Sequence, residues 1–185
     1  MTPTLYLRTA VTADAALILD WRKTTAEWLA ATYGTDQWSV PYDWAKVERW
    51  VSEGHTFMAA LEPDGEPVAT ITSTPEGDPA LWTPEELAVP ARYLNKANVR
   101  REYAGLGIGA CLISWAATRA AKQGVGLVRI DVWSTNHRLH DYYRNMGFRY
   151  LRTVPDTVSG ALFDLPATVV ADLPVVECGS VCAGS

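Results

Sequence analysis

Three glycines that alternate between residues 105 and 109 constrain the fold of this chain more than any other feature. Gly105, Gly107 and Gly109 lie where an extended segment, residues 91–99, should turn into an apolar-periodic helix over residues 111–121. Glycine adopts backbone angles that are closed to other residues and lets a ligand approach the main chain closely. A helix N-terminus adds unpaired N–H groups and the positive end of the helix dipole. The sequence therefore predicts a phosphate-binding turn at this point.

The composition is that of one globular domain and disfavours several kinds of partner. The 185 residues are 48% hydrophobic and 20% charged, with a net charge of −5. This acidic balance disfavours nucleic acid and membrane surfaces as partners. The apolar runs are far too short for a membrane span, and the N-terminus lacks the basic and apolar regions of a signal peptide, so we expect a cytoplasmic protein.

The three cysteines predict neither a disulfide framework nor a metal site. Cys111 falls inside an expected helix, where we interpret it as a small core residue. Cys178 and Cys182 have no histidine or further cysteine nearby, so we interpret them as incidental thiols rather than half of a metal site. We therefore expect no metal.

Hydrophobic periodicity and turn residues predict mixed strands and helices between residues 4 and 165. Strands are expected at residues 4–8, 55–61, 67–73, 91–99, 127–133, 148–154 and 160–165. Helices are expected at residues 13–32, at 43–52, from the glycine loop to about residue 122, and at 136–146, with a helical turn at residues 84–87. Residues 1–166 should thus form one α/β (α+β) domain: a central mixed, mostly antiparallel sheet of about seven strands, flanked by about four helices. A crossover helix joins the strands around residues 95 and 130, and residues 167–185 are expected to be a loosely ordered tail.

Two kinds of phosphate ligand fit the glycine loop. Residues 105–110 match the dinucleotide fingerprint G-x-G-x-x-[GA], and Asp131, about twenty residues further on in a strand, is placed like its ribose-binding acid. Against this interpretation, the motif comes after residue 100, so too little chain remains for a doubly wound sheet. A hairpin precedes the motif, where further strand–helix units would be needed.

The loop also resembles motif A of the GNAT superfamily of N-acetyltransferases, in which glycines between a strand and a helix cradle the pyrophosphate of acetyl-CoA. Residues 131–136, Asp-Val-Trp-Ser-Thr-Asn, followed by Leu139, Tyr142-Tyr143 and Gly147-Phe148, resemble motif B of that family. The resemblance covers residues 4–165, essentially the whole domain. It implies an N-acetyltransferase with the GNAT fold that moves an acetyl group from acetyl-CoA to a primary amine by direct transfer in a ternary complex. We expect this amine to belong to a small molecule, because nothing in the sequence marks a peptide or histone groove.

The same resemblance assigns a donor site. In the family, the main chain near Asn98 and Val99 pairs with the pantetheine arm and supplies an oxyanion donor. Asn136 matches an asparagine that contacts the pantetheine, and this residue type also suits a helix N-cap. The pyrophosphate would be bound by the backbone of the loop, namely Gly105, Leu106, Gly107, Ile108, Gly109 and Ala110.

The loop departs from the family pattern at one position. The family usually has Arg or Gln where this chain has Ala104, which removes one side-chain donor to the pyrophosphate. Arg100 and Arg101 lie close enough to add positive charge, or are solvated surface residues. The departure leaves room for another donor, such as a longer acyl-CoA, a carrier-protein thioester or an aminoacyl-tRNA, although the acidic charge counts against tRNA. A non-catalytic CoA-binding regulator is a further alternative.

Two residues are candidates for the acid–base chemistry. Tyr143 matches the family tyrosine near the thioester sulfur and would be the general acid; the alternative is a core aromatic beside Phe148. Asp131 is the candidate base, because an acid within a buried strand is costly without a function or a partner. In some members of the family a glutamate twelve residues before the tyrosine acts as base through water, and the alternative for Asp131 is an ion pair with an arginine. Weaker candidates are Glu85, Glu86 and Asp20.

The eight tryptophans suggest where an acceptor would bind. Trp38 and Trp82 lie in expected loops and, with Trp133, are candidates for lining an acceptor pocket. Acidic residues near them favour an amine-bearing acceptor with apolar bulk. Many members of the family dimerise, so a homodimer is compatible with the resemblance. Four tryptophans at helical spacing are interpreted as core: Trp21, Trp28, Trp44 and Trp50.

Overall fold

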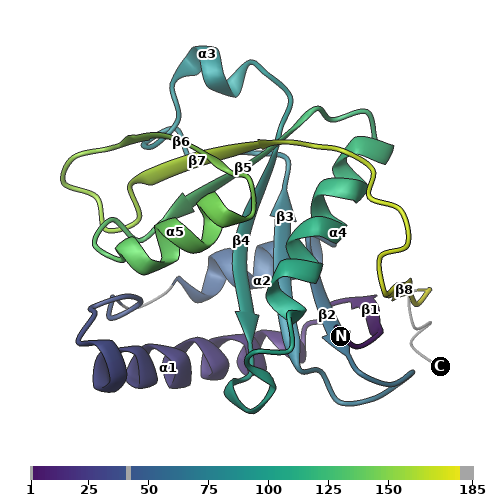
Figure 1. Ribbon diagram of the computed structural model, residues 1–185. Coiled ribbons are helices and arrows are strands. Elements are labelled where there is room, and N and C mark those ends of the chain that lie inside the picture. Colours follow the sequence, from purple (N-terminus) through teal and green to yellow (C-terminus); the bar gives the residue numbers. More distant parts are fainter. Residues whose placement is uncertain (1, 41–42, 180–185) are drawn as a thin grey trace.

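An eight-stranded sheet in the order β6-β7-β5-β4-β3-β2-β1-β8 forms the centre of the computed structural model, which describes residues 2–40 and 43–179 (Figure 1). Neighbouring strands are antiparallel except for the β4–β5 and β1–β8 pairs, so the predicted mixed, mostly antiparallel sheet is confirmed. The strands are β1 (Leu5–Thr9), β2 (Thr56–Ala60), β3 (Ala69–Thr74), β4 (Arg92–Val99), β5 (Leu127–Val132), β6 (Arg149–Thr153), β7 (Ala161–Pro166) and β8 (Val175–Glu177).

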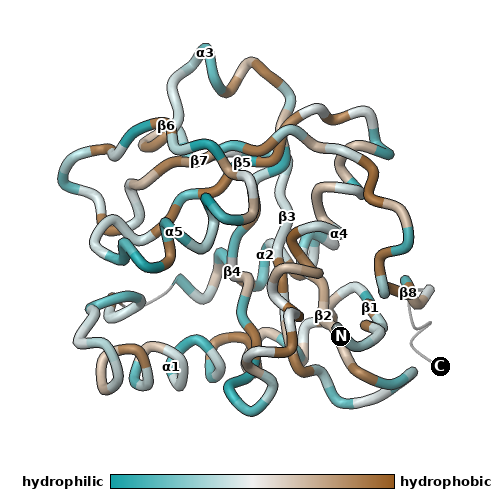
Figure 2. Tube along the Cα trace, viewed as in Figure 1, coloured by the Kyte–Doolittle hydropathy of each residue, from teal (hydrophilic) through white to brown (hydrophobic). Residues whose placement is uncertain are grey.

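Helices cover both faces of this sheet. They are α1 (Asp14–Tyr33), α2 (Trp44–Ser52), α3 (Pro84–Leu87), α4 (Ile108–Lys122) and α5 (His137–Asn145), with a 3₁₀ turn at Arg101–Tyr103. Successive residues of β2 point to opposite faces of the sheet. Phe57 packs in the hydrophobic cluster that includes α4, whereas Met58 packs against α1 and α2. The buried residues of α1 lie in its first half (Asp14, Ala15, Ile18 and Trp21), and Figure 2 shows hydrophobic and hydrophilic positions mixed along the helix.

The parallel strands β4 and β5 diverge after a short paired region. Their register covers only Arg92 to Leu94 on β4, opposite residues 128–130 of β5. On the other side of β4, Thr70 and Thr72 of β3 pair with Asn98 and Asn95, so β4 holds one extra residue in a bulge. A bulge bends its strand and increases the local twist. This bend leaves residues 95–99 of β4 without a registered partner on the side of β5.

The tail beyond residue 166 is more ordered than predicted. β8 adds a parallel strand to the edge of β1, where Leu5 N–H donates to the Pro174 carbonyl (2.8 Å) and Cys178 N–H donates to the Leu7 carbonyl (2.7 Å). Glu177 accepts hydrogen bonds from Trp115 Nε1 (2.9 Å) and from Arg119 (3.0 Å), which fixes the strand to α4. The expectation of a loosely ordered tail is therefore wrong for β8, Val175–Glu177. Cys182 lies outside the described residues.

Of the residues interpreted as core, the structure confirms Cys111 and contradicts Trp44. Cys111 is buried in the main core, as predicted. Trp44 is 44% exposed, so its interpretation as a core residue is wrong. Trp44 is the first residue of α2 and lies outside the packed face of this helix. It follows the N-cap residue Asp43, whose carboxylate accepts the Ala45 N–H. Trp21 and Trp50 are buried.

Candidate functional site

Two cavities meet beside β5. The first, which we name the β4–β5 cavity, has a volume of about 370 Å³ and lies between the diverging strands, α1, α5 and the first turns of α4. The second, which we name the α2 cavity, has a volume of about 950 Å³ and lies between α2, the β3–α3 loop and the β6–β7 loop. Both are lined by Trp38, Asn95, Asp131, Trp133 and Ser159.

The glycine loop places the N-terminus of α4 at the end of the β4–β5 cavity. Gly105 (φ 83°) and Gly107 (φ 74°) have left-handed backbone conformations, which L side chains rarely adopt. Gly107 is the N-cap of α4 and supplies no side-chain cap, so the first N–H groups of the helix are left for another acceptor. Gly109 lines the cavity, and a Cβ there would lie 3.4 Å from the Tyr142 hydroxyl.

The predicted donor residues divide into two groups. Five of them line the cavity: Asn98, Val99, Arg101, Gly109 and Asn136. The others do not line it, although Gly105 and Leu106 form the turn, Gly107 caps α4, and Ile108 and Ala110 lie in its first turn. The side chain of Ile108 is buried in the core.

The two arginines before the loop have different surroundings. Arg100 forms an ion pair with Glu102 and does not line the cavity, so its charge is compensated locally. The guanidinium of Arg101 lies 3.4 Å from the ring centroid of Trp28 on α1 and does line the cavity. Stacking on an aromatic face holds a guanidinium in place without neutralising it. Arg101 is therefore a cation available to an anionic ligand at this end.

Asn98 presents a buried polar group without a partner. Its side chain is only 7% exposed, and its Oδ1 accepts a hydrogen bond from Thr25 Oγ1 (3.2 Å). Its Nδ2 makes no hydrogen bond within the described residues, and neither does the buried hydroxyl of its cross-strand neighbour Thr70. Because buried donors are nearly always paired, a ligand or a water is expected beside the amide of Asn98.

Tyr143 lines the β4–β5 cavity from α5. Its ring packs against Phe148 (centroids 5.4 Å apart) and lies beside Tyr142 (5.4 Å). Burial, the neighbouring Tyr142 and the negative charge of Asp131 together raise the pKa of Tyr143 above its ordinary value. The hydroxyl therefore stays protonated at neutral pH and can act as a proton donor. Tyr142 is 39% exposed and also lines the cavity.

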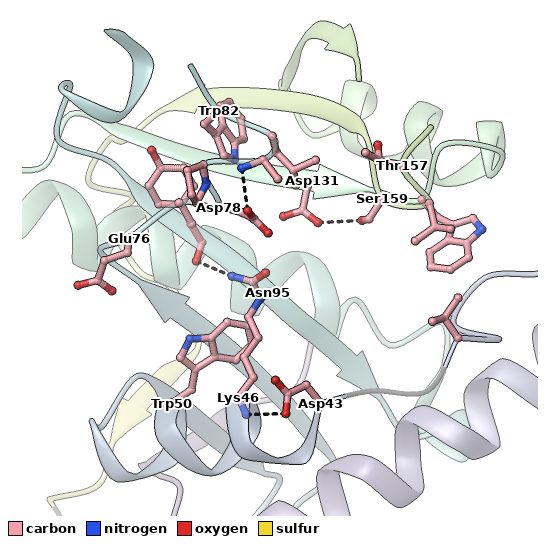
Figure 3. Close-up of a pocket in the computed structure, with 18 of the residues that line it drawn as sticks. Asp43, Lys46, Trp50, Glu76, Asp78, Trp82, Asn95, Asp131, Thr157 and Ser159 are labelled. Atoms are coloured by element: carbon pink, nitrogen blue, oxygen red, sulfur yellow. Dashed lines mark hydrogen bonds between the residues drawn. The ribbon is translucent and has the colours of Figure 1, made fainter. Parts of the chain in front are cut away.

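Asp131 lies where the two cavities join. Its Oδ2 accepts a hydrogen bond from Ser159 Oγ (2.8 Å), as Figure 3 shows. Arg129, two residues earlier on the same face of β5, directs its Nη1 to the Glu86 carbonyl (2.6 Å) and the Tyr93 hydroxyl (2.9 Å). A carboxylate at this junction can be reached by molecules in either cavity.

Asn136 and the predicted tryptophans also adjoin these cavities. Asn136 is the N-cap of α5, since its Oδ1 accepts the Leu139 N–H (3.0 Å), and its amide donates to Gln37. Trp133 donates its Nε1–H to Asp36 (2.8 Å), and Trp38 lines both cavities from its loop.

Trp82 is less accessible than its loop position suggested. It is 2% exposed and packs edge-on against Tyr93 (5.5 Å), so it belongs to a small core whose surface forms part of the α2 cavity wall. Sequence reasoning missed Lys46 and Trp50 of α2 and Asp78 of the following loop as lining residues. Helical periodicity placed Trp50 in the core, and no local signal shows which buried residue also borders a cavity.

Glu86 is a structural carboxylate rather than a base. It pairs with both terminal nitrogens of Arg152, and this pairing lowers the pKa of Glu86 to about 2. Its carboxylate also accepts the Thr83 N–H in a capping box at α3. A carboxylate held in this way is too weakly basic to take a proton from an amine.

The Glu86→Gln variant is expected to be less stable than the parent by about 1 kcal/mol at pH 7, because the partly solvated ion pair is lost. Because the pKa of Glu86 is lower in the folded than in the unfolded chain, its ionised form stabilises the folded protein at pH values above the unfolded pKa of about 4.3. The difference between the two proteins should therefore shrink as the pH falls from 4.5 through about 2. Urea unfolding at several pH values measures it, with Glu85→Gln as the solvated control. A difference that is independent of pH would contradict the ion-pair explanation.

Among residues 2–40 and 43–179, no three His, Cys, Asp or Glu side chains gather in a group that could hold a metal ion. Within the same ranges, no helix has the length and apolar character needed to cross a bilayer.

Comparison with known proteins identifies the family. The model of the acetyltransferase (GNAT) family matches residues 20–148, so this chain belongs to the GNAT acetyltransferases. It is 30% identical over 150 residues to the uncharacterized N-acetyltransferase YesJ of Bacillus subtilis strain 168, covering 79% of this chain and 82% of YesJ. The family membership confirms the predicted enzyme class and decides between the two interpretations of the glycine loop.

Solved structures share the fold. A GNAT family acetyltransferase from Listeria monocytogenes 4b F2365 superimposes with a TM-score of 0.74 at 22% identity, over 88% of this chain and 94% of that one. The PaiA N-acetyltransferase of Thermoplasma acidophilum, solved in complex with coenzyme A, gives a TM-score of 0.65 at 17% identity, over 88% and 98% of the two chains. The predicted GNAT fold is thus confirmed.

Proposed function

We propose that this enzyme transfers an acetyl group from acetyl-CoA to a primary amine of a small molecule, in a single step within a ternary complex. The observation that carries the proposal is the meeting of two separate cavities at Asp131, with Tyr143 lining the first of them. Donor and acceptor can then approach one point from opposite sides. No covalent enzyme intermediate is needed for such a transfer.

The β4–β5 cavity suits the donor. The uncapped N-terminus of α4 and the guanidinium of Arg101 would hold the pyrophosphate. Residues 95–99 of β4 have no registered partner on the side of β5, so their backbone groups can pair with the amides of the pantetheine arm. Asn136 lines the same cavity and would contact the arm, while the Nδ2 of Asn98 would gain its missing acceptor.

The α2 cavity suits the acceptor. Its volume of about 950 Å³ is in the range of small-molecule sites, and its walls combine aromatic rings with charged side chains. Trp38 and Trp133 border both cavities and would enclose the reacting atoms. Trp82 would contribute only the edge of its ring.

The chemistry follows from the positions of two side chains. Asp131 would take a proton from the acceptor ammonium, directly or through a water, so that the neutral nitrogen can attack the thioester carbonyl. Backbone N–H groups on the open edge of β4 would stabilise the oxyanion that forms. As the carbon–sulfur bond breaks, Tyr143 would donate its proton to the departing thiolate. The nitrogen would lose its second proton as the amide forms, which restores the proton of Tyr143 through water, and Asp131 would release its proton to solvent.

Titration calorimetry tests the donor site. Acetyl-CoA is expected to bind with micromolar affinity, while NADH, as the matched dinucleotide, produces no heat. The Asn98→Leu variant should bind acetyl-CoA about 5- to 10-fold more weakly, since the hydrogen bond from its Nδ2 to the donor is lost.

The exposed Asn145 at the end of α5 provides the control, and Asn145→Leu should leave the affinity unchanged. Equal affinity of Asn98→Leu and the parent protein would show that the buried amide does not contact the donor. Failure of acetyl-CoA to bind at all would contradict the proposed function.

A further inference from the structure

The charged side chains of the α2 cavity are divided between its two sides. One side, from α1 and α2, carries three cations, Arg22, Lys46 and Arg49, and one carboxylate, that of Asp43, which caps α2. The opposite side, from the β3–α3 loop, β5 and the β6–β7 loop, carries four carboxylates: Glu76, Asp78, Asp131 and Asp156. Figure 3 shows Lys46 and Trp50 on α2 facing Asp78 and Asp131 across the cavity.

Two of the cations that line the α2 cavity lack a carboxylate partner among the described residues. Neither Lys46 nor Arg49 forms an ion pair within the described residues, and the ammonium of Lys46 lies 5.0 Å from the ring centroid of Trp50. The nearby Asp43 uses its carboxylate to accept the N–H groups of Ala45 and Lys46 at the start of α2. By contrast, five arginines elsewhere are neutralised by adjacent carboxylates, in the pairs Arg8–Asp14, Arg100–Glu102, Arg119–Glu177, Arg149–Asp164 and Arg152–Glu86.

The reaction itself fixes one end of the acceptor. If the proposed function holds, the amine lies at Asp131, because this is the one carboxylate among the five described residues that line both the α2 cavity and the β4–β5 cavity. The remainder of the acceptor then extends toward α2. A second positive charge would be repelled by Lys46 and Arg49, whereas an anionic group would be attracted by both.

We propose that the acceptor is a zwitterionic small molecule, an amine that also carries a carboxylate, oriented with its amine at Asp131 and its carboxylate at Lys46 and Arg49. This assignment rests on the proposed acetyl transfer. Trp50, which borders the α2 cavity beside Lys46, supplies an apolar surface for an apolar side chain of the acceptor. α-Amino acids with apolar side chains have this chemistry.

Paired acceptors test the assignment. Aromatic and aliphatic α-amino acids are each compared with their decarboxylated amines and with a linear diamine, and release of the CoA thiol is followed with a thiol reagent. The amino acid is expected to have a kcat/KM at least 10-fold higher than its decarboxylated partner. In Lys46→Glu this advantage should fall at least 10-fold. The amine pKa of each acceptor is the same with both enzymes, so the change in the ratio reports the protein.

Lys23→Glu is the matched control, since Lys23 is an α1 lysine whose side chain is 77% exposed, and it should preserve the advantage. Equal or better turnover of the decarboxylated amines or the diamine would overturn the zwitterion assignment but not the acetyl transfer. The same conclusion would follow if Lys46→Glu left the kcat/KM ratio of amino acid to decarboxylated amine unchanged. Absence of CoA release with every amine would overturn the proposed function and the assignment together.

Discussion

Replacement of Tyr143 by phenylalanine is expected to lower kcat about 100-fold while the dissociation constant of acetyl-CoA stays within about twofold of the parent value. The ring, and with it the packing against Phe148, is retained, so the variant loses only the hydroxyl group that would donate the proton. General acid catalysis contributes about 10²- to 10⁴-fold, and a thiolate is a good enough leaving group to place this case at the lower end. Steady-state kinetics and calorimetry on the same preparation measure the two quantities.

The raised pKa of Tyr143 adds a second expectation. Because this hydroxyl keeps its proton beyond the ordinary value of about 10, the parent enzyme should show no loss of kcat from deprotonation of the acid below that pH. Tyr150→Phe, which removes an exposed hydroxyl bonded to Thr153, is the control and should keep full activity. Full activity of Tyr143→Phe would contradict its role as the general acid and would leave Tyr143 only a packing role in the lining of the β4–β5 cavity.

The local sequence determined most of the elements. The bounds of α1 and α2 were predicted to within one residue, because Gly34 ends α1 in a left-handed conformation and Asp43 caps α2. The glycine loop predicted the N-terminus of α4 for the same reason, since Gly107 must adopt a positive φ there. Such signals depend only on neighbouring residues.

Features that depend on distant contacts were missed. β8 is a three-residue strand whose order comes from β1 and from α4, more than fifty residues away, so no periodicity could reveal it. Trp82 was placed in a loop correctly, yet its burial against Tyr93 is a tertiary contact. The split of charge across the α2 cavity likewise joins α2 with loops around residues 78 and 157, which lie far apart in the chain.

Replacement of Asp131 by asparagine is expected to lower kcat/KM at pH 7 by about 100- to 1,000-fold, because the base is lost while the side chain keeps nearly the same shape. An alkyl ammonium has a pKa of about 10, so the variant should regain about tenfold per pH unit as the neutral amine becomes more abundant, whereas the parent should change less. Profiles of kcat/KM from pH 6 to 10 measure this. Asp141→Asn, which removes an exposed carboxylate on α5, is the control for the change in net charge.

The same variant separates the two interpretations of Asp131. If the carboxylate were present mainly to compensate an arginine, its loss would leave a charge unpaired and lower the free energy of unfolding by about 3–5 kcal/mol, with parallel pH profiles for the two proteins. As a base bonded to Ser159, it should instead cost little stability, and the effect should appear in the slope of the profile. Because stability and pH slope are measured independently, a variant that is destabilised without a change of slope would contradict the catalytic assignment. Asp131 would then serve only to support the junction of the two cavities.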